Sequence, residues 1–176
     1  MIYAIIGGVL VIIIGIFVIS FMYYRNKYEF LYIKVKEADN NLDILLQKKE
    51  EILLKIVPIL EEDKIKDIPP VGKLKMQRLD HRELYTELMK MTKEMLHIID
   101  DYDGKIDLEK ISPLIDKLNE NENDLRAALK YYNDNSEEIN YLAHKFPANL
   151  VKTFSHYQDV ESYKIEKRDS FEILKN

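Results

Sequence analysis

Residues 28–62 read YEFLYIKVKEADNNLDILLQKKEEILLKIVPILEE, and their apolar side chains recur at alternating spacings of three and four residues. The recurring positions form one stripe with a wider margin at three leucines: Tyr28, Leu31, Val35, Ala38, Leu42, Leu45, Lys49, Ile52, Ile56 and Ile59, then Leu46, Leu53 and Leu60. This spacing predicts an α-helix with the broad apolar stripe of a bundle helix. We expect the helix to end near Glu62, with Pro58 in its last turns.

Residues 1–24, MIYAIIGGVLVIIIGIFVISFMYY, precede this helix and contain no charged side chain. As a helix at about 1.5 Å per residue they extend roughly 36 Å, enough to cross a hydrocarbon core of about 30 Å. A cleaved signal peptide has basic residues before its apolar core and small residues at its cleavage site, and this segment has neither. We therefore predict an uncleaved anchor in the lipid bilayer that continues directly into the helix of residues 28–62.

Charges beside the anchor predict its orientation. Arg25, Lys27, Lys34 and Lys36 lie just after it, whereas only the α-amino group lies before it. The positive-inside tendency then keeps the C-terminal side in the cytoplasm. The prediction is a single-pass protein of the cell membrane with its short N-terminus outside and its C-terminal domain in the cytoplasm.

Small residues on one face of the anchor would allow two copies to approach closely. Ala4, Gly8 and Gly15 have this arrangement. Glycine is also simply common in membrane helices, so a homo-oligomer is one of two interpretations.

Two further helices follow in the sequence pattern. After an interruption at residues 69–72, PPVG, a second stripe runs through Leu74, Gln77, His81, Leu84, Leu88, Met91, Met95 and Ile98. After a turn at residues 100–105, with Asp103-Gly104 as its break, a third stripe runs through Leu108, Ile111, Ile115, Leu118, Glu122, Leu125, Leu129, Tyr132, Ser136, Ile139 and Ala143. Phe146-Pro147 should stop the third helix.

These patterns predict an all-α fold, in which an N-terminal transmembrane helix continues into an antiparallel bundle of three long helices plus a short fourth segment at residues 148–157. The divisions are an anchor at residues 1–24, a helical bundle domain at residues 25–158 and a flexible C-terminal tail at residues 159–176. We expect helix one to leave the membrane, helix two to return and helix three to leave again.

Counting residues along helices in these directions brings Glu122 to the height of Lys48 and Lys49. Because an unpaired charge on an apolar stripe is costly, we predict that Glu122 pairs with one of these lysines. The alternative is that the lysine stem extends to solvent and never meets Glu122.

One set of residues in the third helix and just beyond it forms a recognisable pattern: Glu122-Asn123, Tyr132-Asn133, Asn140 and Phe146-Pro147-Ala148-Asn149-Leu150-Val151. The set resembles the LemA family, which typically shows Glu-Asn, Tyr-Asn, a second Tyr-Asn one heptad later and Phe-Pro-x-Asn. The family usually carries an Arg-Arg pair before an acidic residue and Leu-Ile-Pro in helix one, where residues 48–53 here read KKEEIL.

Three departures from the family pattern stand out. Ile139 replaces the tyrosine of the second Tyr-Asn, Leu54 replaces a frequent proline, and lysines replace the arginine pair. Since lysine lacks the bidentate fork of arginine, the ion pair between helices one and three should be looser here. The resemblance implies a membrane-anchored antiparallel helical bundle whose molecular function is unsettled.

Asn133 and Asn140 lie seven residues apart on one helix face. We expect them to bond across helices or to the backbone near Phe146-Pro147, and so to close that end of the bundle. The functional alternative is that Tyr132, Asn133 and Asn140 line a binding surface.

The sequence shows no spacing of residues that is typical of a catalytic or metal-binding site. The histidines at 81, 97, 144 and 156 have no metal-ligand spacing with one another, and paired carboxylates sit on adjacent residues that face apart. The excess of 31 acidic over 26 basic residues disfavours nucleic acid as a partner. We predict no enzyme, no cofactor and no catalytic or metal-binding residue.

The favoured function is therefore a non-enzymatic interaction or scaffold protein that contacts other membrane or envelope proteins. The alternative is a metal-dependent activity in the bundle core around Glu94, His97 and Glu122, although a di-metal bundle needs the Glu-x-x-His motif twice and it occurs once. A coiled-coil oligomer is a third interpretation.

Overall fold

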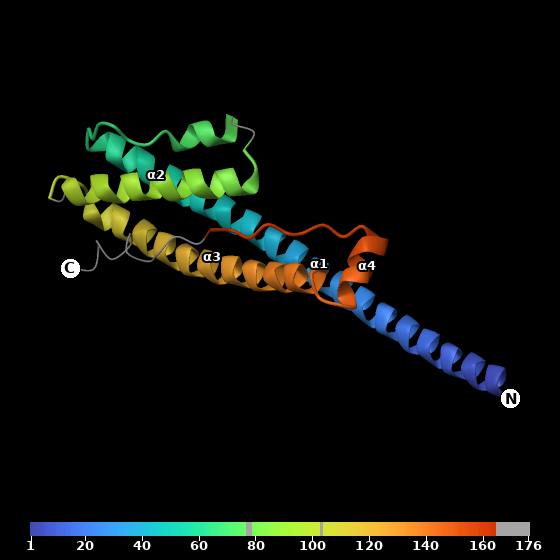
Figure 1. Cartoon of the computed structure of the whole chain (residues 1–176). Helices are drawn as coiled ribbons and strands as arrows, with labels where there is room; N and C mark the ends of the chain where they lie inside the picture. Colours follow the sequence, from blue (N-terminus) through green and yellow to red (C-terminus); the bar gives the residue numbers. More distant parts are fainter. Residues whose placement is uncertain (77–78, 103, 165–176) are drawn as a thin grey trace. The chain divides into compact units, whose positions relative to one another are not determined.

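The computed structural model describes residues 1–76, 79–102 and 104–164. Its helices are α1 (Ile2–Glu62), the 3-10 helix η1 (Val71–Met76), α2 (His81–Asp101), α3 (Leu108–Ala143) and α4 (Ala148–Ser155) (Figure 1). With no strand in these ranges, the all-α prediction is confirmed. The predicted stripe position Gln77, the turn residue Asp103 and tail residues 165–176 lie outside the described residues, so the flexible tail stays a prediction.

The chain divides into two compact units. The first comprises residues 1–38 and 131–162, and the second comprises residues 39–130 and the chain from Tyr163 onward. Both α1 and α3 contribute to each unit.

The apolar stripes predicted for α1 and α3 form the interiors of these units. The stripe predicted for α2 is partly wrong, because His81, Leu84 and Ile98 are only half-buried while Tyr85, Met89, Leu96 and Ile99 are buried. Along α1 every stripe position from Tyr28 to Ile56 is buried, and along α3 every position from Ile111 to Ala143 is buried. Burial of each such aliphatic or aromatic side chain contributes about 1.5–3 kcal/mol. The bounds of α1 and α3 agree with the predicted ends at Glu62 and Phe146-Pro147.

In the second unit, α1 ends in a Schellman motif. Lys64 adopts a left-handed conformation (φ 58°), its N–H donates to the Glu61 carbonyl at 3.0 Å, and the Ile65 N–H donates to the Leu60 carbonyl at 3.0 Å. Ile65 and Leu60 are both buried, which is the apolar contact that accompanies this motif. The motif turns the chain back along the unit.

The second long helix starts later than predicted. The stripe beginning at Leu74 was expected to be helical throughout, but α2 begins at His81 and Leu74 lies in η1. Asp80 caps α2, since its Oδ1 accepts from the Arg82 and Glu83 backbone N–H groups at 2.9 and 2.8 Å. The Glu83 side chain in turn accepts from the Asp80 N–H at 3.2 Å, which completes a capping box.

The predicted order of helix directions is wrong. At the start of α2, His81 lies 3.6 Å from both Asp39 and Asp43, and further along Met89 lies 3.2 Å from Lys49. Therefore α2 runs parallel to α1, and α3, whose Lys110 pairs with Glu62 at 3.3 Å, runs antiparallel to both. Because α2 begins beside Asp39 and Asp43, the chain has already returned along α1 before His81, and α2 does not make the return.

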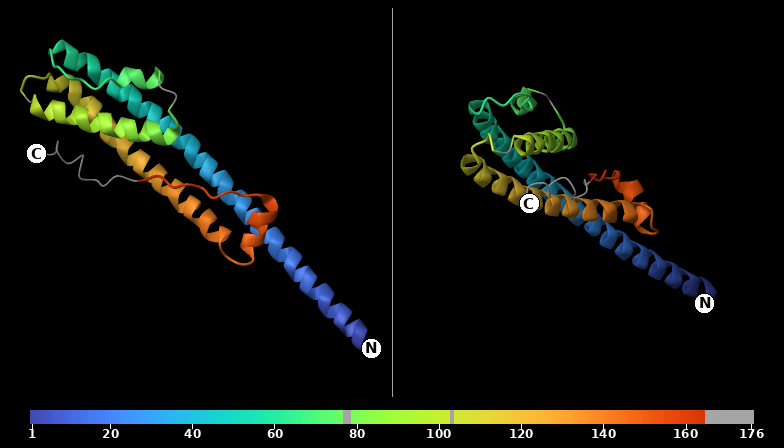
Figure 2. Two further views of the ribbon diagram at one scale, coloured as in Figure 1. Left: turned by 45° about the horizontal axis from the view of Figure 1, so that its top comes forward. Right: turned by 90° about the vertical axis from the view of Figure 1, so that its left-hand side faces the viewer.

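The first unit joins α4 to α1 and α3 (Figure 2). Lys27 of α1 pairs with Glu138 of α3 at 2.7 Å, and this hydrogen bond raises the pKa of Lys27. The Tyr157 ring, just after α4, stacks on Tyr28 and Tyr32 with ring centres 5.0 and 5.1 Å away. These contacts hold the short fourth segment against α1.

The segment after α4 also makes defined contacts. The Tyr32 hydroxyl donates to the Gln158 carbonyl, and Asn140 exchanges two hydrogen bonds with the Val160 backbone, at 2.7 and 2.9 Å. The predicted boundary of the tail at residue 159 thus falls inside a stretch that these bonds attach to the first unit.

The N-terminal part of α1 differs from everything that follows. It is the one stretch among the described residues that is long and apolar enough to cross a membrane, and none of its most apolar window is buried. In the same helix the residues from Tyr28 onward carry the buried stripe.

Candidate functional site

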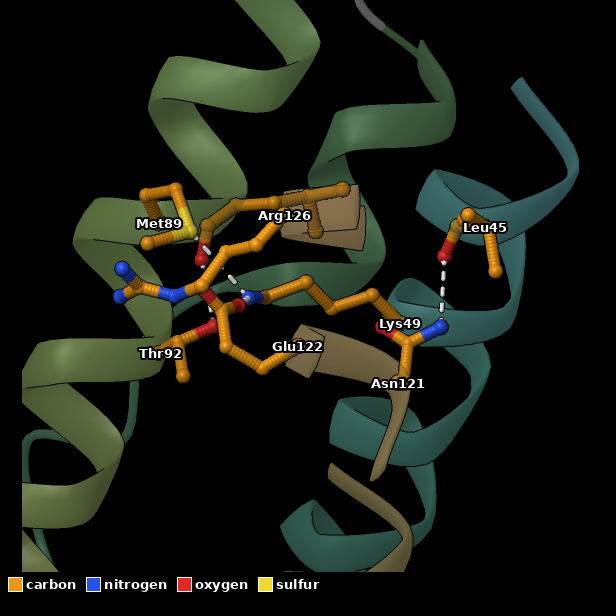
Figure 3. Close-up of polar contacts among 8 residues, drawn as sticks. Leu45, Lys49, Met89, Thr92, Asn121, Glu122 and Arg126 are labelled. Atoms are coloured by element: carbon orange, nitrogen blue, oxygen red, sulfur yellow. Dashed lines mark hydrogen bonds and ion pairs between the residues drawn. The ribbon is translucent and has the colours of Figure 1, made fainter. Parts of the chain in front are cut away.

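A buried ion pair joins α1 and α3 in the second unit. Lys49 Nζ lies 2.5 Å from Glu122 Oε2, and the exposed fractions of the two side chains are 0% and 6% (Figure 3). The predicted pairing of Glu122 with one of the two lysines is therefore confirmed, and the partner is Lys49. Lys48 is exposed.

Glu122 holds a second cation on its other oxygen. Arg126, one turn later on α3, places Nε 3.2 Å from Glu122 Oε1. Lys49 Nζ also donates to the Met89 sulfur at 3.2 Å, which brings α2 into the group. We name Lys49, Met89, Glu122 and Arg126 the buried charge cluster.

Burial explains why the charges of the cluster pair with one another. A buried ammonium without a partner costs several kcal/mol, and a carboxylate placed between two cations offsets that cost. The attraction need not add net stability, but it is satisfied in only one register of α1, α2 and α3. The chemical role that this geometry supports is the alignment of three helices.

Asn121 strengthens the same contact one residue before Glu122. Its Nδ2 donates to the Leu45 carbonyl at 3.1 Å, one turn before Lys49 on α1, and the side chain is fully buried (Figure 3). Its Oδ1 has no hydrogen-bond partner in the part of the chain that the structure describes. Thr92 satisfies its own hydroxyl within α2 by donating to the Leu88 carbonyl at 2.6 Å.

Three residues in or beside the buried charge cluster were not predicted from the sequence: Arg126, Asn121 and Met89. Glu122 and Arg126 stand four residues apart, which is the spacing for an ion pair within one helix, and that signal was available. Asn121 lies beside the stripe position Glu122, so its burial could have been read from the periodicity. Met89 carries no signal for a lysine contact, because thioether sulfur is only a weak acceptor.

The other residues of the sequence pattern differ in how deeply they are buried. Tyr132 is buried, Asn133 and Pro147 are half-buried, and Asn123 and Phe146 are exposed. Asn140 binds the backbone, but at Val160 instead of near Phe146-Pro147 as expected. The chain after α4 returns along α3 and brings the Val160 backbone to Asn140.

Glu94, His97 and Glu122 do not form a common site. Glu94 is exposed, and the His97 side chain is 72% exposed and pairs with Asp101 at 2.8 Å. Glu122 is held by Lys49 and Arg126. Within the described ranges no three His, Cys, Asp or Glu residues are placed to hold a metal ion.

Comparison with protein families links this geometry to a known group. The family model described as LemA family matches residues 41–173, which include all residues of the buried charge cluster and most of the chain. Comparisons with curated proteins and with solved structures each gave no match. The pattern of residues 122–151, the helical fold and this match agree, and the chain therefore belongs to the LemA family.

Proposed function

We propose that the protein is a single-pass membrane protein whose helical domain lies in the cytoplasm and acts, without catalysis, as an interaction module for other membrane or envelope proteins. The observation that carries the proposal is the change along α1. Its first part is uncharged and unburied, and its later part carries a buried stripe. One helix thus serves as both membrane span and scaffold.

The non-enzymatic part of the proposal is supported by the state of the interior charges. The carboxylate of Glu122 faces two cations, and the fully buried Lys49 faces Glu122 and Met89. A general acid or base must exchange protons with a bound substrate, so groups engaged in this way suit a structural role better.

Single cysteines test the orientation, because the natural chain has none. We expect a cysteine inserted directly after Met1 to react with a membrane-impermeant maleimide in intact cells and Asn123→Cys to react only after permeabilisation. Met1 and Asn123 are both exposed. Labelling of Asn123→Cys in intact cells would overturn the cytoplasmic placement.

Site-specific crosslinking tests the interaction. Ile44 is the exposed apolar residue of α1 in the second unit, with 63% of its surface accessible. A photo-crosslinking residue at Ile44 should yield adducts of defined mass in cells, whereas the buried position Leu46 should yield none. If no surface position of the helical domain gave an adduct, the interaction function would be excluded. Adducts of twice the chain mass would identify a second copy as the partner.

A further inference from the structure

Large aromatic side chains are exposed where α3 passes into α4. Phe146, in the turn between these helices, is 78% exposed, and Phe154, near the end of α4, is 68% exposed. Tyr141, in the last turn of α3, is also exposed. Phenylalanine has no polar atom that water could satisfy, so two such side chains together indicate a surface that is covered in use.

At Phe154, this surface lies beside the end of the apolar segment of α1. The Phe154 ring contacts the Phe21 ring, with ring centres 6.2 Å apart. Phe21 belongs to the last turn before Arg25, where the uncharged run ends. Because that run is longer than a hydrocarbon core of about 30 Å, its last turn falls at the level of the lipid headgroups.

The exposed rings cannot simply turn inward, because α4 is held on its other side. Ala148 and Val151 are buried against the rest of the first unit. Tyr157 stacks on two tyrosines of α1, and Lys152 pairs with Asp159 at 2.8 Å. The orientation of Phe154 is therefore imposed by the fold.

The charge at this surface suits anionic lipid. Lys145 directly precedes Phe146, and its Nζ lies 5.0 Å from the centre of the Tyr141 ring. Among the described residues no carboxylate pairs with Lys145. A basic residue with aromatic neighbours is the composition of segments that lie in the membrane interface.

We propose that the α3–α4 turn and α4 form a second membrane-binding element, which inserts Phe146 and Phe154 at the boundary between headgroups and acyl chains and directs Lys145 to lipid phosphates. The inference rests on the proposed membrane span of residues 1–24. It adds that the first unit is fixed to the bilayer at two places instead of being tethered by α1 alone.

Tryptophan substitution tests the insertion directly, because the natural chain contains no tryptophan. The full-length protein is placed in nanodiscs containing brominated phospholipids, which quench a tryptophan only at close range. Phe146→Trp and Phe154→Trp report on the proposed element. Leu10→Trp reports on the membrane span, and Tyr131→Trp, exposed on α3 about 18 Å before the end of that helix, is the matched control in water.

We expect quenching of Leu10→Trp, Phe146→Trp and Phe154→Trp, and none of Tyr131→Trp. If Leu10→Trp were quenched but the two phenylalanine positions behaved like Tyr131→Trp, the second membrane-binding element would be excluded and the membrane span would stand. If Leu10→Trp were not quenched, the span and this inference would both fail. Unchanged far-ultraviolet circular dichroism shows that each variant is folded.

Two further readouts separate lipid from other coverings. Shielding of Phe154→Trp from aqueous acrylamide without quenching by brominated lipid would mean that protein covers the surface, which overturns the proposal. Lys145→Glu should reduce quenching of Phe146→Trp in nanodiscs with anionic lipid and have less effect in zwitterionic ones. An equal effect in both would remove Lys145 from the proposed contact with phosphate.

Discussion

At the scale of single residues, Glu122 has the largest consequences. It is the carboxylate shared by Lys49 and Arg126 in the buried charge cluster. Removing Glu122 leaves the buried charge of Lys49 without this carboxylate, whereas removing one of the two cations leaves Glu122 paired with the other one. The structure therefore predicts unequal costs for the two kinds of substitution.

Glu122→Gln should lower the free energy of unfolding by about 3–5 kcal/mol, because Lys49 remains buried without a carboxylate. Lys49→Met should cost less, since methionine fills a similar volume and Arg126 still faces Glu122. Chemical unfolding of the full chain in detergent, followed by circular dichroism, measures both values.

Lys48→Met is the matched control for these variants. This neighbouring lysine is exposed, so its replacement should change stability by no more than about 0.5 kcal/mol. A loss for Lys49→Met as large as that for Glu122→Gln would contradict the shared role of the Glu122 carboxylate.

Tyr28 predicts a pH dependence at the alkaline end. Burial raises its pKa from 10.0 to about 12, and the negative charges of Tyr32 and Asp159 act in the same direction. Because the folded-state pKa lies above the unfolded one, the stability from Tyr28 is complete below pH 10 and is lost as the pH rises towards 12. Tyr28→Phe should remove this part of the alkaline destabilisation.

At neutral pH the same variant should be close to neutral. The Tyr28 hydroxyl has no hydrogen-bond partner within the described part of the chain, so its removal breaks no bond. Unfolding curves of both proteins at pH 7 and at several values above pH 10 measure the two effects. A loss of more than about 1 kcal/mol at pH 7 would show that the hydroxyl has a partner.

At the scale of elements, the long helices were predictable and the connection between the first two was not. The stripes of α1 and α3 continue for many turns, so their identity and ends follow from periodicity. The stripe predicted for the second helix wrongly included Leu74, because this residue of η1 continues the three- and four-residue spacing. Asp80 and Glu83 carry the spacing of a capping box, and this signal marks the true start.

Asp80→Ala should therefore destabilise the protein by about 1 kcal/mol, because two backbone N–H groups of α2 lose their acceptor. Asp80→Asn should retain most of the stability, since asparagine also caps well. Thermal unfolding of the full chain ranks the variants. Asp124→Ala, at an exposed position inside α3, serves as control, and an equal effect there would contradict the cap.

The pair of Lys49 and Glu122 was predicted correctly from an incorrect topology. Lys49 lies 13 residues before the end of α1, and Glu122 lies 14 residues after the start of α3. The two residues therefore reach similar heights when α3 begins beside the end of α1 and runs antiparallel to it, as observed. In the predicted order the second helix would have returned the chain along α1 first, and the count happened to give a similar height. Periodicity specifies which side chains are buried, but it contains no information on helix direction.

At the scale of the molecule, the direction of α2 is the feature most open to a test. Bismaleimide crosslinking with a short spacer should join Asp39→Cys to His81→Cys within one chain, because the natural side chains lie 3.6 Å apart. It should not join Asp39→Cys to Asp101→Cys, since α2 extends about 30 Å between His81 and Asp101. The opposite result would restore an α2 antiparallel to α1.

The pairing of α1 with α3 also affects folding during synthesis of the chain. Lys49 and Glu122 are separated by 73 residues of chain, and the return segment adds no long helix of its own that could cover α1 earlier. During synthesis, the apolar stripe of α1 therefore stays incompletely covered until α3 has been made.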